Sequence, residues 1–148
     1  EVLATEGKYV GPVKGFSMLP MLVAERDSVV IYAEKGPYIP LDVVLYKRGE
    51  DYVLHRIVRV LDGEYIIRGD NCYYDERVKK QQILGVLREF FHGENHIFCD
   101  NENYLKYAKK RVRNYFLRKA GYKLKGFAKK VLRIPYKMVK RLTKKGEL

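Results

Sequence analysis

The sequence lacks several features that would assign it to a familiar class. It has no tryptophan, and its two cysteines are too few for a disulfide framework or a four-cysteine zinc site, which argues against a small disulfide-stapled secreted domain. We expect Cys72 and Cys99 to be reduced thiols, with a single Cys72–Cys99 bridge as the alternative. No run of 18 or more apolar residues occurs and no secretory leader opens the chain, so the sequence predicts no membrane-spanning helix.

Acidic residues are nearly missing from the last third of the chain. The whole sequence has 30 Lys and Arg against 18 Asp and Glu, but residues 101–148 hold 17 of these basic residues and, as acidic residues, only Glu102 and Glu147. With 47% hydrophobic residues, the chain has enough apolar material for a core. The sequence therefore predicts two parts, a domain over residues 1–100 and a basic segment over residues 101–148.

Short β-branched and aromatic runs, separated by Gly, Pro and Asp, fill the first part. Their apolar residues alternate as in strands, and the Asp62–Gly63 pair indicates a tight hairpin. The spacing leaves no room for crossover helices, so we predict a mainly β domain, an antiparallel and coil-rich barrel or sandwich. The expected strands are Tyr9–Val13, Ser28–Ala33, Asp42–Tyr46, Tyr52–Leu61, Glu64–Arg68, Ile83–Phe91 and His96–Cys99.

After Asp100 the apolar period changes from about 2 to about 3.6, which is typical of amphipathic helices. We predict one helix from about Asn103 to Lys119, a break at Gly121 and a second helix with a kink caused by Pro135 near Arg133. The apolar stripe of the second helix comprises Leu124, Phe127, Ala128, Val131, Leu132, Met138, Val139 and Leu142.

Three segments carry residues suited to nucleophilic catalysis. Ser17 lies in a Gly-Phe-Ser-Met-Leu-Pro turn, His55 lies in a predicted strand, and Asp70 follows the next strand in Gly-Asp-Asn. Each has an ordinary structural alternative, since a serine or aspartate often caps a turn and a histidine can be a satisfied core residue. Together they supply a nucleophile, a base and an orienting acid.

These motifs, with Asp-Val-Val-Leu-Tyr at residues 42–46 and His-Arg-Ile at 55–57, resemble the type I signal peptidase superfamily, which includes LexA-like autoproteases. The resemblance covers residues 8–100. A histidine at position 55 is similar to the archaeal, endoplasmic-reticulum and SipW-like branch, whereas the bacterial branch has lysine there. LexA-like self-cleavage is disfavoured because that branch uses lysine and no DNA-binding helical domain precedes Ser17.

The resemblance implies a serine endopeptidase that cleaves leader or precursor peptides, with Ser17 as nucleophile and His55 as general base. The aspartate that orients His55 is expected to be Asp70 or, as second choice, Asp75. Gly15 stands where many bacterial members have an oxyanion-binding serine, so backbone N–H groups, including that of Ser17, are expected to take this role. Should His55 prove dispensable, Lys47 or Lys79 is the alternative base.

The basic segment requires a partner of its own. Lys and Arg beside an apolar stripe are typical of an interfacial helix, so we expect an anionic membrane surface as partner. Nucleic acid is a less favoured partner, suited by the basic charge and by Tyr104, Tyr107, Tyr115 and Tyr122, and packing onto a partner protein or onto the chain's own β domain is a further alternative. With no leader or spanning helix, the sequence favours peripheral attachment on the cytoplasmic side.

A non-catalytic or regulatory module of the same fold, whose tail binds membrane, nucleic acid or a partner protein, is the alternative to a peptidase. Retention of Ser17, His55 and Asp70 favours the enzyme. His92, His96 and Cys99 lack convincing ligand spacing, and no phosphate-binding glycine loop occurs, so we expect no metal and no cofactor.

Overall fold

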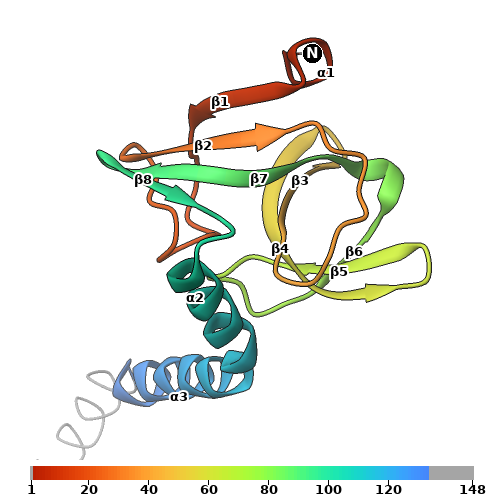
Figure 1. The fold of residues 1–148 in the computed structure, drawn as a ribbon. Coiled ribbons are helices and arrows are strands. Elements are labelled where there is room, and N and C mark those ends of the chain that lie inside the picture. The colour runs from red at the N-terminus through yellow and green to blue at the C-terminus, as the bar shows by residue number, and fades with distance from the viewer. Residues whose placement is uncertain (1, 134–148) are drawn as a thin grey trace, which may run out of the picture. The chain divides into compact units, whose positions relative to one another are not determined.

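A computed structural model describes residues 2–133 and consists mainly of a curved antiparallel sheet followed by helices (Figure 1). Its strands are β1 (Lys8–Pro12), β2 (Asp27–Tyr32), β3 (Val43–Arg48), β4 (Asp51–Leu61), β5 (Glu64–Arg68), β6 (Glu76–Lys79), β7 (Ile83–His92) and β8 (Asn95–Phe98). Its helices are α1 (Val2–Glu6), the 3-10 turn η1 (Lys80–Gln82), α2 (Glu102–Arg113) and α3 (Tyr115–Arg133).

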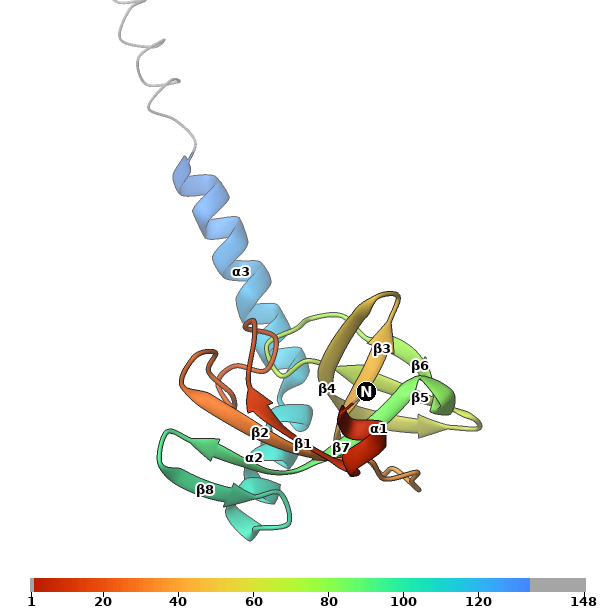
Figure 2. The ribbon, with the colours of Figure 1, turned by 90° about the horizontal axis from the view of Figure 1, so that it is seen from above.

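The strands follow the order β1-β2-β7-β3-β4-β5-β6, and β8 also pairs with β7. All neighbours are antiparallel. Register shifts at Val30/Ile31, Leu45/Tyr46 and Ile57/Arg59 mark bulges, which increase the local twist of a sheet. The sheet curls into the half-barrel seen in Figures 1 and 2.

The predicted mainly β, antiparallel fold with C-terminal helices is confirmed. Each of the seven predicted strands corresponds to a strand of the structure, with ends that differ by a few residues. Strand β6 was not predicted because Val78 is its only buried residue and the other three are charged. The short helix α1 has no buried residue and was also missed.

Helix α2 belongs to the same compact unit as the sheet. Its Tyr104 and Ala108 are buried in a cluster with Met18, Leu22 and Phe90. A second cluster, around Tyr46, Val44, Ile57 and Ile67, fills the other part of the barrel. The first unit therefore extends to Arg113, rather than ending at residue 100 as the sequence predicted.

The second unit begins at Asn114. Helix α3 continues through Gly121, so the predicted break there is wrong and the interruption lies at Asn114 instead. A helical glycine costs only about 1 kcal/mol relative to alanine, which one residue in a 19-residue helix can tolerate. The predicted kink at Pro135 and the apolar positions Met138, Val139 and Leu142 lie outside the described residues.

Both cysteines are free thiols, so the alternative Cys72–Cys99 bridge is absent. Among the described helices, none has the length and apolar character needed to cross a membrane.

Candidate functional site

Ser17 lies on a loop between β1 and β2 that is anchored by its neighbours. Met18 is 3% exposed and Leu22 is fully buried, and the backbone N–H of Leu22 donates to the carbonyl of Met18 at 3.1 Å. Gly15, with φ +76°, provides the left-handed turn that starts the loop. Ser17 itself is only partly buried, so apolar anchors hold a hydroxyl at the edge of the core.

The Gly69–Asn71 turn holds the backbone of this loop from the other side. The backbone N–H of Asn71 donates to the Ser17 carbonyl at 2.7 Å, and its side-chain amide donates to the Phe16 carbonyl at 3.2 Å. Helix α2 adds a third support, because Arg111 donates to the carbonyls of Leu19 at 3.2 Å and Asp70 at 2.9 Å. The two loops are thus tied together by backbone contacts.

Gly69 lies where the Ser17 loop, His55 and Cys72 come close to one another. A Cβ at this position would lie 2.7 Å from the Ser17 carbonyl oxygen and 2.8 Å from both Cys72 Sγ and His55 Nε2. Distances this short cannot be relieved by moving a flexible side-chain end alone, since one of the three atoms is backbone. The glycine is therefore required for Ser17 and His55 to approach each other.

Replacing Gly69 with alanine should reduce any peptide hydrolysis about 10- to 100-fold, because the new methyl group displaces the Ser17 loop from His55. Overpacking should also lower the free energy of unfolding by about 1–3 kcal/mol. Gly121→Ala is the matched control, since nothing lies within 4 Å of that position, and it should leave hydrolysis unchanged. Full activity and stability in Gly69→Ala would show that the close approach does not matter.

His55 lies on β4 and is 2% exposed. Its Nδ1 lies 3.2 Å from the Tyr46 hydroxyl and 3.4 Å from Glu76 Oε1. Tyr46 and His55 share a face of the β3–β4 ladder, where His55 pairs with Val44. Its other nitrogen, Nε2, is buried and has no hydrogen-bond partner among the described residues, which is unusual for a buried polar atom and needs a functional or structural reason.

The surroundings of His55 favour a neutral ring with its proton on Nδ1. Burial lowers the pKa of the imidazole, and the nearby Glu76 carboxylate opposes this only in part. Burial, together with the charge of Glu76 and a hydrogen bond to it, raises the pKa of Tyr46. When the Tyr46 hydroxyl donates to Glu76, its oxygen accepts from Nδ1–H, and Nε2 retains its lone pair.

Asp70 acts on His55 through its charge, which raises the pKa of the imidazole. Its two carboxylate oxygens each accept from Arg56 at 2.8 Å, and one also accepts from Tyr107 at 3.0 Å. Arg56 follows His55 on β4 and so points to the opposite face of the strand. The buried Asp70 carboxylate thus binds Arg56, and its expected role in orienting His55 stays a prediction.

The other expected carboxylate, Asp75, is 43% exposed at its side chain and pairs with Arg68. The ion-pair partner of Asp75 is thus Arg68 and not His55. Glu76, the next residue and the first of β6, takes the position beside Nδ1. Glu76 was not predicted because β6 was not predicted; Val78, the one apolar residue among charged neighbours at 76–79, gives only a weak strand signal.

The remaining candidate residues are paired with side chains other than Ser17 and His55, or are exposed. Lys47 pairs with Glu50 at 3.7 Å and lines a cavity that Ser17 and His55 also line. Lys79 is exposed at the end of β6. His92 lies 3.2 Å from Asp27, and His96 pairs with Glu89. Within residues 2–133, no three His, Cys, Asp or Glu side chains lie close enough together to hold a metal ion.

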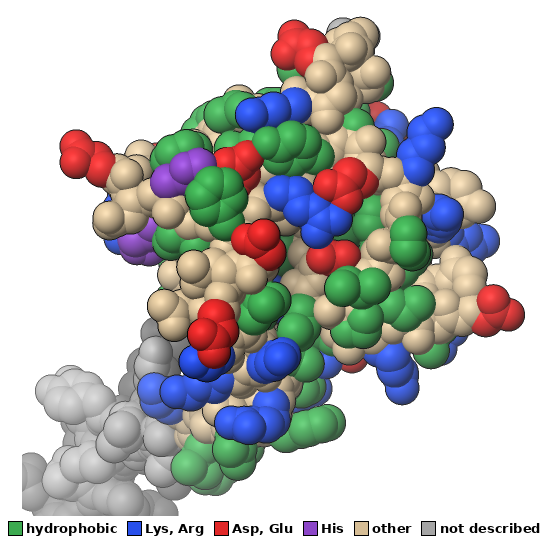
Figure 3. Space-filling view, viewed as in Figure 1, with side chains coloured by type: hydrophobic (Ala, Val, Ile, Leu, Met, Phe, Trp, Pro, Cys, Tyr) green, Lys and Arg blue, Asp and Glu red, His purple; other side chains and the backbone are tan. Residues whose placement is uncertain are grey.

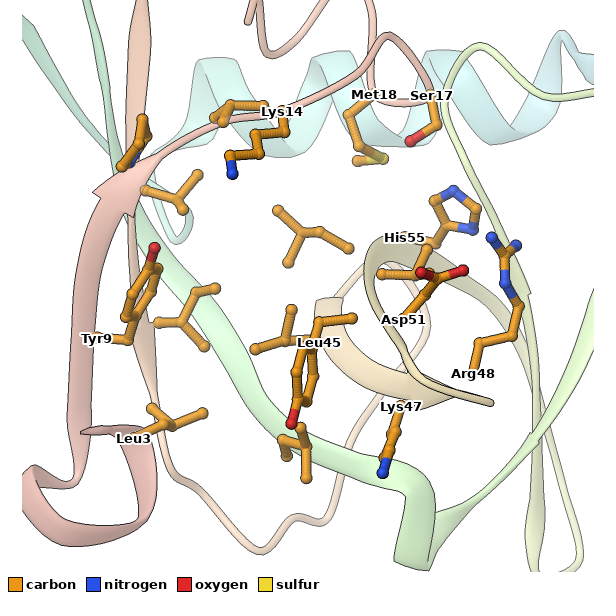
Figure 4. Close-up of a pocket in the computed structure, with 18 of the residues that line it drawn as sticks. Leu3, Tyr9, Lys14, Ser17, Met18, Leu45, Lys47, Arg48, Asp51 and His55 are labelled. Carbon is orange, nitrogen blue, oxygen red and sulfur yellow. The ribbon is translucent and has the colours of Figure 1, made fainter. Parts of the chain in front are cut away.

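Ser17 and His55 border one cavity of about 980 Å³ (Figure 4). The Ser17 hydroxyl points into the space that the His55 ring also borders. No hydrogen bond joins them in this ligand-free structure; such contacts often tighten only with substrate. Both apolar and charged side chains line the cavity; they include Leu3, Tyr9, Met18, Leu45, Lys14, Arg48 and Asp51.

Cys72 is a second nucleophilic side chain near His55, because its Sγ and Nε2 both lie 2.8 Å from the same Cβ position at Gly69. Burial raises the pKa of this thiol. A thiol with a raised pKa is protonated at neutral pH and is a weak nucleophile. Ser17, whose hydroxyl points into the cavity, is therefore the better candidate.

No protein-family model matches the chain, and no curated protein matches it significantly in sequence.

Proposed function

We propose that this protein is a serine endopeptidase that cleaves leader or precursor peptides at Ser17, by chemistry resembling that of signal peptidases. One observation carries the proposal. The ring of a buried histidine borders the cavity into which a serine hydroxyl points; one ring nitrogen has no hydrogen-bond partner among the described residues, and the other is held by a tyrosine and a glutamate. This is the arrangement required of a nucleophile, a base and an orienting group.

In the acylation step, Ser17 Oγ attacks the carbonyl carbon of the scissile peptide bond and His55 Nε2 accepts the hydroxyl proton. The tetrahedral intermediate then collapses, and Nε2–H donates that proton to the leaving amine. The backbone N–H of Ser17 donates no hydrogen bond to the described residues, so it is free to stabilise the oxyanion. Water, activated by the same nitrogen, then hydrolyses the acyl-enzyme.

Tyr46 and Glu76 support this proton transfer. They hold the ring by Nδ1, which leaves the lone pair of Nε2 available to accept a proton. When His55 becomes an imidazolium, the Glu76 carboxylate at 3.4 Å stabilises the positive charge. Glu76 is thus the positioning carboxylate in place of the expected aspartates.

The cavity suits a peptide in an extended conformation. Its lining includes apolar side chains from β1, β2 and β3, such as Tyr9, Ile31 and Leu45, and its volume is sufficient for several side chains. Charged side chains of the lining, such as Lys14 and Arg48, can bind the polar backbone of a bound peptide. Apolar segments of precursor peptides are accordingly the substrates that we propose.

Incubation of the purified protein with apolar precursor peptides tests this function. Mass spectrometry should detect cleavage at discrete bonds, and Ser17→Ala should abolish it. If the wild-type protein and Ser17→Ala leave every peptide equally intact, the alternative of a non-catalytic module of the same fold is supported instead.

The pH dependence of hydrolysis should identify the carboxylate that acts on His55. Because burial lowers the pKa of this histidine below its ordinary value of 6.5, kcat/KM should rise with pH through a midpoint below 6.5 and level off by pH 7. Glu76 raises this pKa, so Glu76→Gln should move the midpoint to lower pH and decrease the plateau about tenfold. Asp75→Asn is the matched control, and a profile altered by Asp75→Asn but not by Glu76→Gln would contradict the assignment.

We also propose that the enzyme acts at a membrane surface as a peripheral protein. Helix α3 supports this location, because it carries exposed apolar side chains together with basic ones.

A further inference from the structure

Helix α3 has two chemically distinct faces. At 100° per residue, Phe116, Leu117, Leu124 and Phe127 fall within about one third of its circumference. These four side chains are 78%, 75%, 72% and 67% exposed, respectively. An exposed apolar stripe of this length on a helix marks an interaction surface.

Basic side chains, together with the exposed Tyr122, occupy the rest of the helix surface. Arg118, Lys119, Lys123 and Lys125 lie outside the apolar arc, and residues 115–133 include no acidic residue. A solvated surface helix ordinarily mixes charges of both signs, which form pairs along the helix. Figure 3 shows Lys and Arg side chains beside hydrophobic ones over the helical part of the chain.

Helix α2 does not contribute to this interaction surface, although the sequence predicted residues 101–148 as one basic segment. Its apolar residues Tyr104 and Ala108 are buried in the core of the first unit, and Tyr107 binds Asp70. Within residues 102–133, the exposed large apolar side chains are all on α3. The interaction surface therefore begins at the second unit.

We propose that α3 lies in the plane of an anionic lipid membrane, with Phe116, Leu117, Leu124 and Phe127 inserted at the boundary between headgroups and acyl chains. The basic side chains remain in the headgroup layer and bind lipid phosphates. This proposal specifies how the protein binds the membrane surface proposed above, and it does not depend on catalysis by Ser17. Nucleic acid would bind the cations but would leave the aliphatic side chains of Leu117 and Leu124 in water.

Co-flotation of the full chain with vesicles tests the proposal. Vesicles that contain about 30% phosphatidylglycerol should bind the protein at low salt, and pure phosphatidylcholine vesicles should bind it at least tenfold more weakly. Leu124→Ser/Phe127→Ser should weaken binding at least tenfold without a change in net charge. Ile39→Ser/Phe98→Ser is the matched control, because it removes the same kinds of exposed side chain from the first unit and should bind within twofold of wild type.

The lack of native tryptophan permits a direct measurement of insertion. On addition of the anionic vesicles, Phe127→Trp should show a blue shift of its emission, whereas Lys125→Trp, on the basic face, should show a much smaller one. Equal shifts, unimpaired binding of Leu124→Ser/Phe127→Ser, or binding to single-stranded nucleic acid but not to vesicles would overturn the proposal. Ser17→Ala should bind vesicles as wild type does, so failure of binding is distinguishable from failure of the peptidase function.

Discussion

Replacement of Ser17 by alanine is expected to reduce peptide hydrolysis at least about 10³-fold, because the acyl-enzyme can no longer form. His55→Ala should cause a loss of similar size, since Ser17 then has no base to accept its proton. The double variant should be no worse than either single one, because the two groups act in the same step. Steady-state kinetics on one cleaved peptide measures all three rates.

The chain supplies a matched control for each substitution. Ser28, on β2, is the only other serine, and His92 is a histidine that borders another cavity. Ser28→Ala and His92→Ala should retain hydrolysis within about threefold of wild type. Retention of full activity in His55→Ala would contradict the assigned base and would direct attention to Lys47, which borders the same cavity as Ser17.

Replacement of Asp70 by asparagine should have the largest effect on stability, about 3–5 kcal/mol in the free energy of unfolding. Asp70 is 3% exposed and Arg56 is fully buried, so the substitution leaves a buried guanidinium without its carboxylate. The same pair meets Tyr104 and Tyr107 of α2, since Tyr104 accepts from Arg56 and Tyr107 donates to Asp70. Its loss therefore loosens α2 from the sheet.

Urea unfolding of Asp70→Asn beside Asp75→Asn measures this effect. Asp75 pairs with Arg68 at a position that is 43% exposed, and the loss of such a pair should cost less than about 1 kcal/mol. An Asp70→Asn protein with nearly wild-type stability would contradict the structural role. If it were stable but had lost the pH dependence of hydrolysis below pH 6.5, the expectation that Asp70 orients His55 would be supported.

The strands were predictable because they are short β-branched and aromatic runs bounded by turn residues, as Glu64–Arg68 is by Gly63 and Gly69. Strand β6 was not, because its pairing with β5 is a long-range contact that leaves only Val78 in the core. Glu76 was therefore not predicted as part of the site, because it is the first residue of β6. A local pattern reports whether a segment buries a face, but not which charged residue a neighbouring strand brings to a histidine.

The contacts of Asp70 and of α2 are also long-range, and local sequence patterns do not show such contacts. Asp70 follows a strand in a motif, and the sequence did not show that Arg56, on the opposite face of β4 from His55, would bind it. Likewise, the tyrosines of residues 103–119 fitted an exposed basic helix, yet Tyr104 is buried against Phe90. Ser17 and His55, by contrast, were identified from their motifs, and the structure places both at one cavity.

Covalent labelling with a fluorophosphonate probe, followed by peptide mapping, tests the central claim that His55 activates Ser17. The probe should label the wild-type protein at Ser17 and leave Ser28 unmodified. His55→Ala should abolish this labelling, and His92→Ala should retain it. No labelling of the wild-type protein, labelling at Ser28, or equal labelling of Ser17 in His55→Ala would contradict the account.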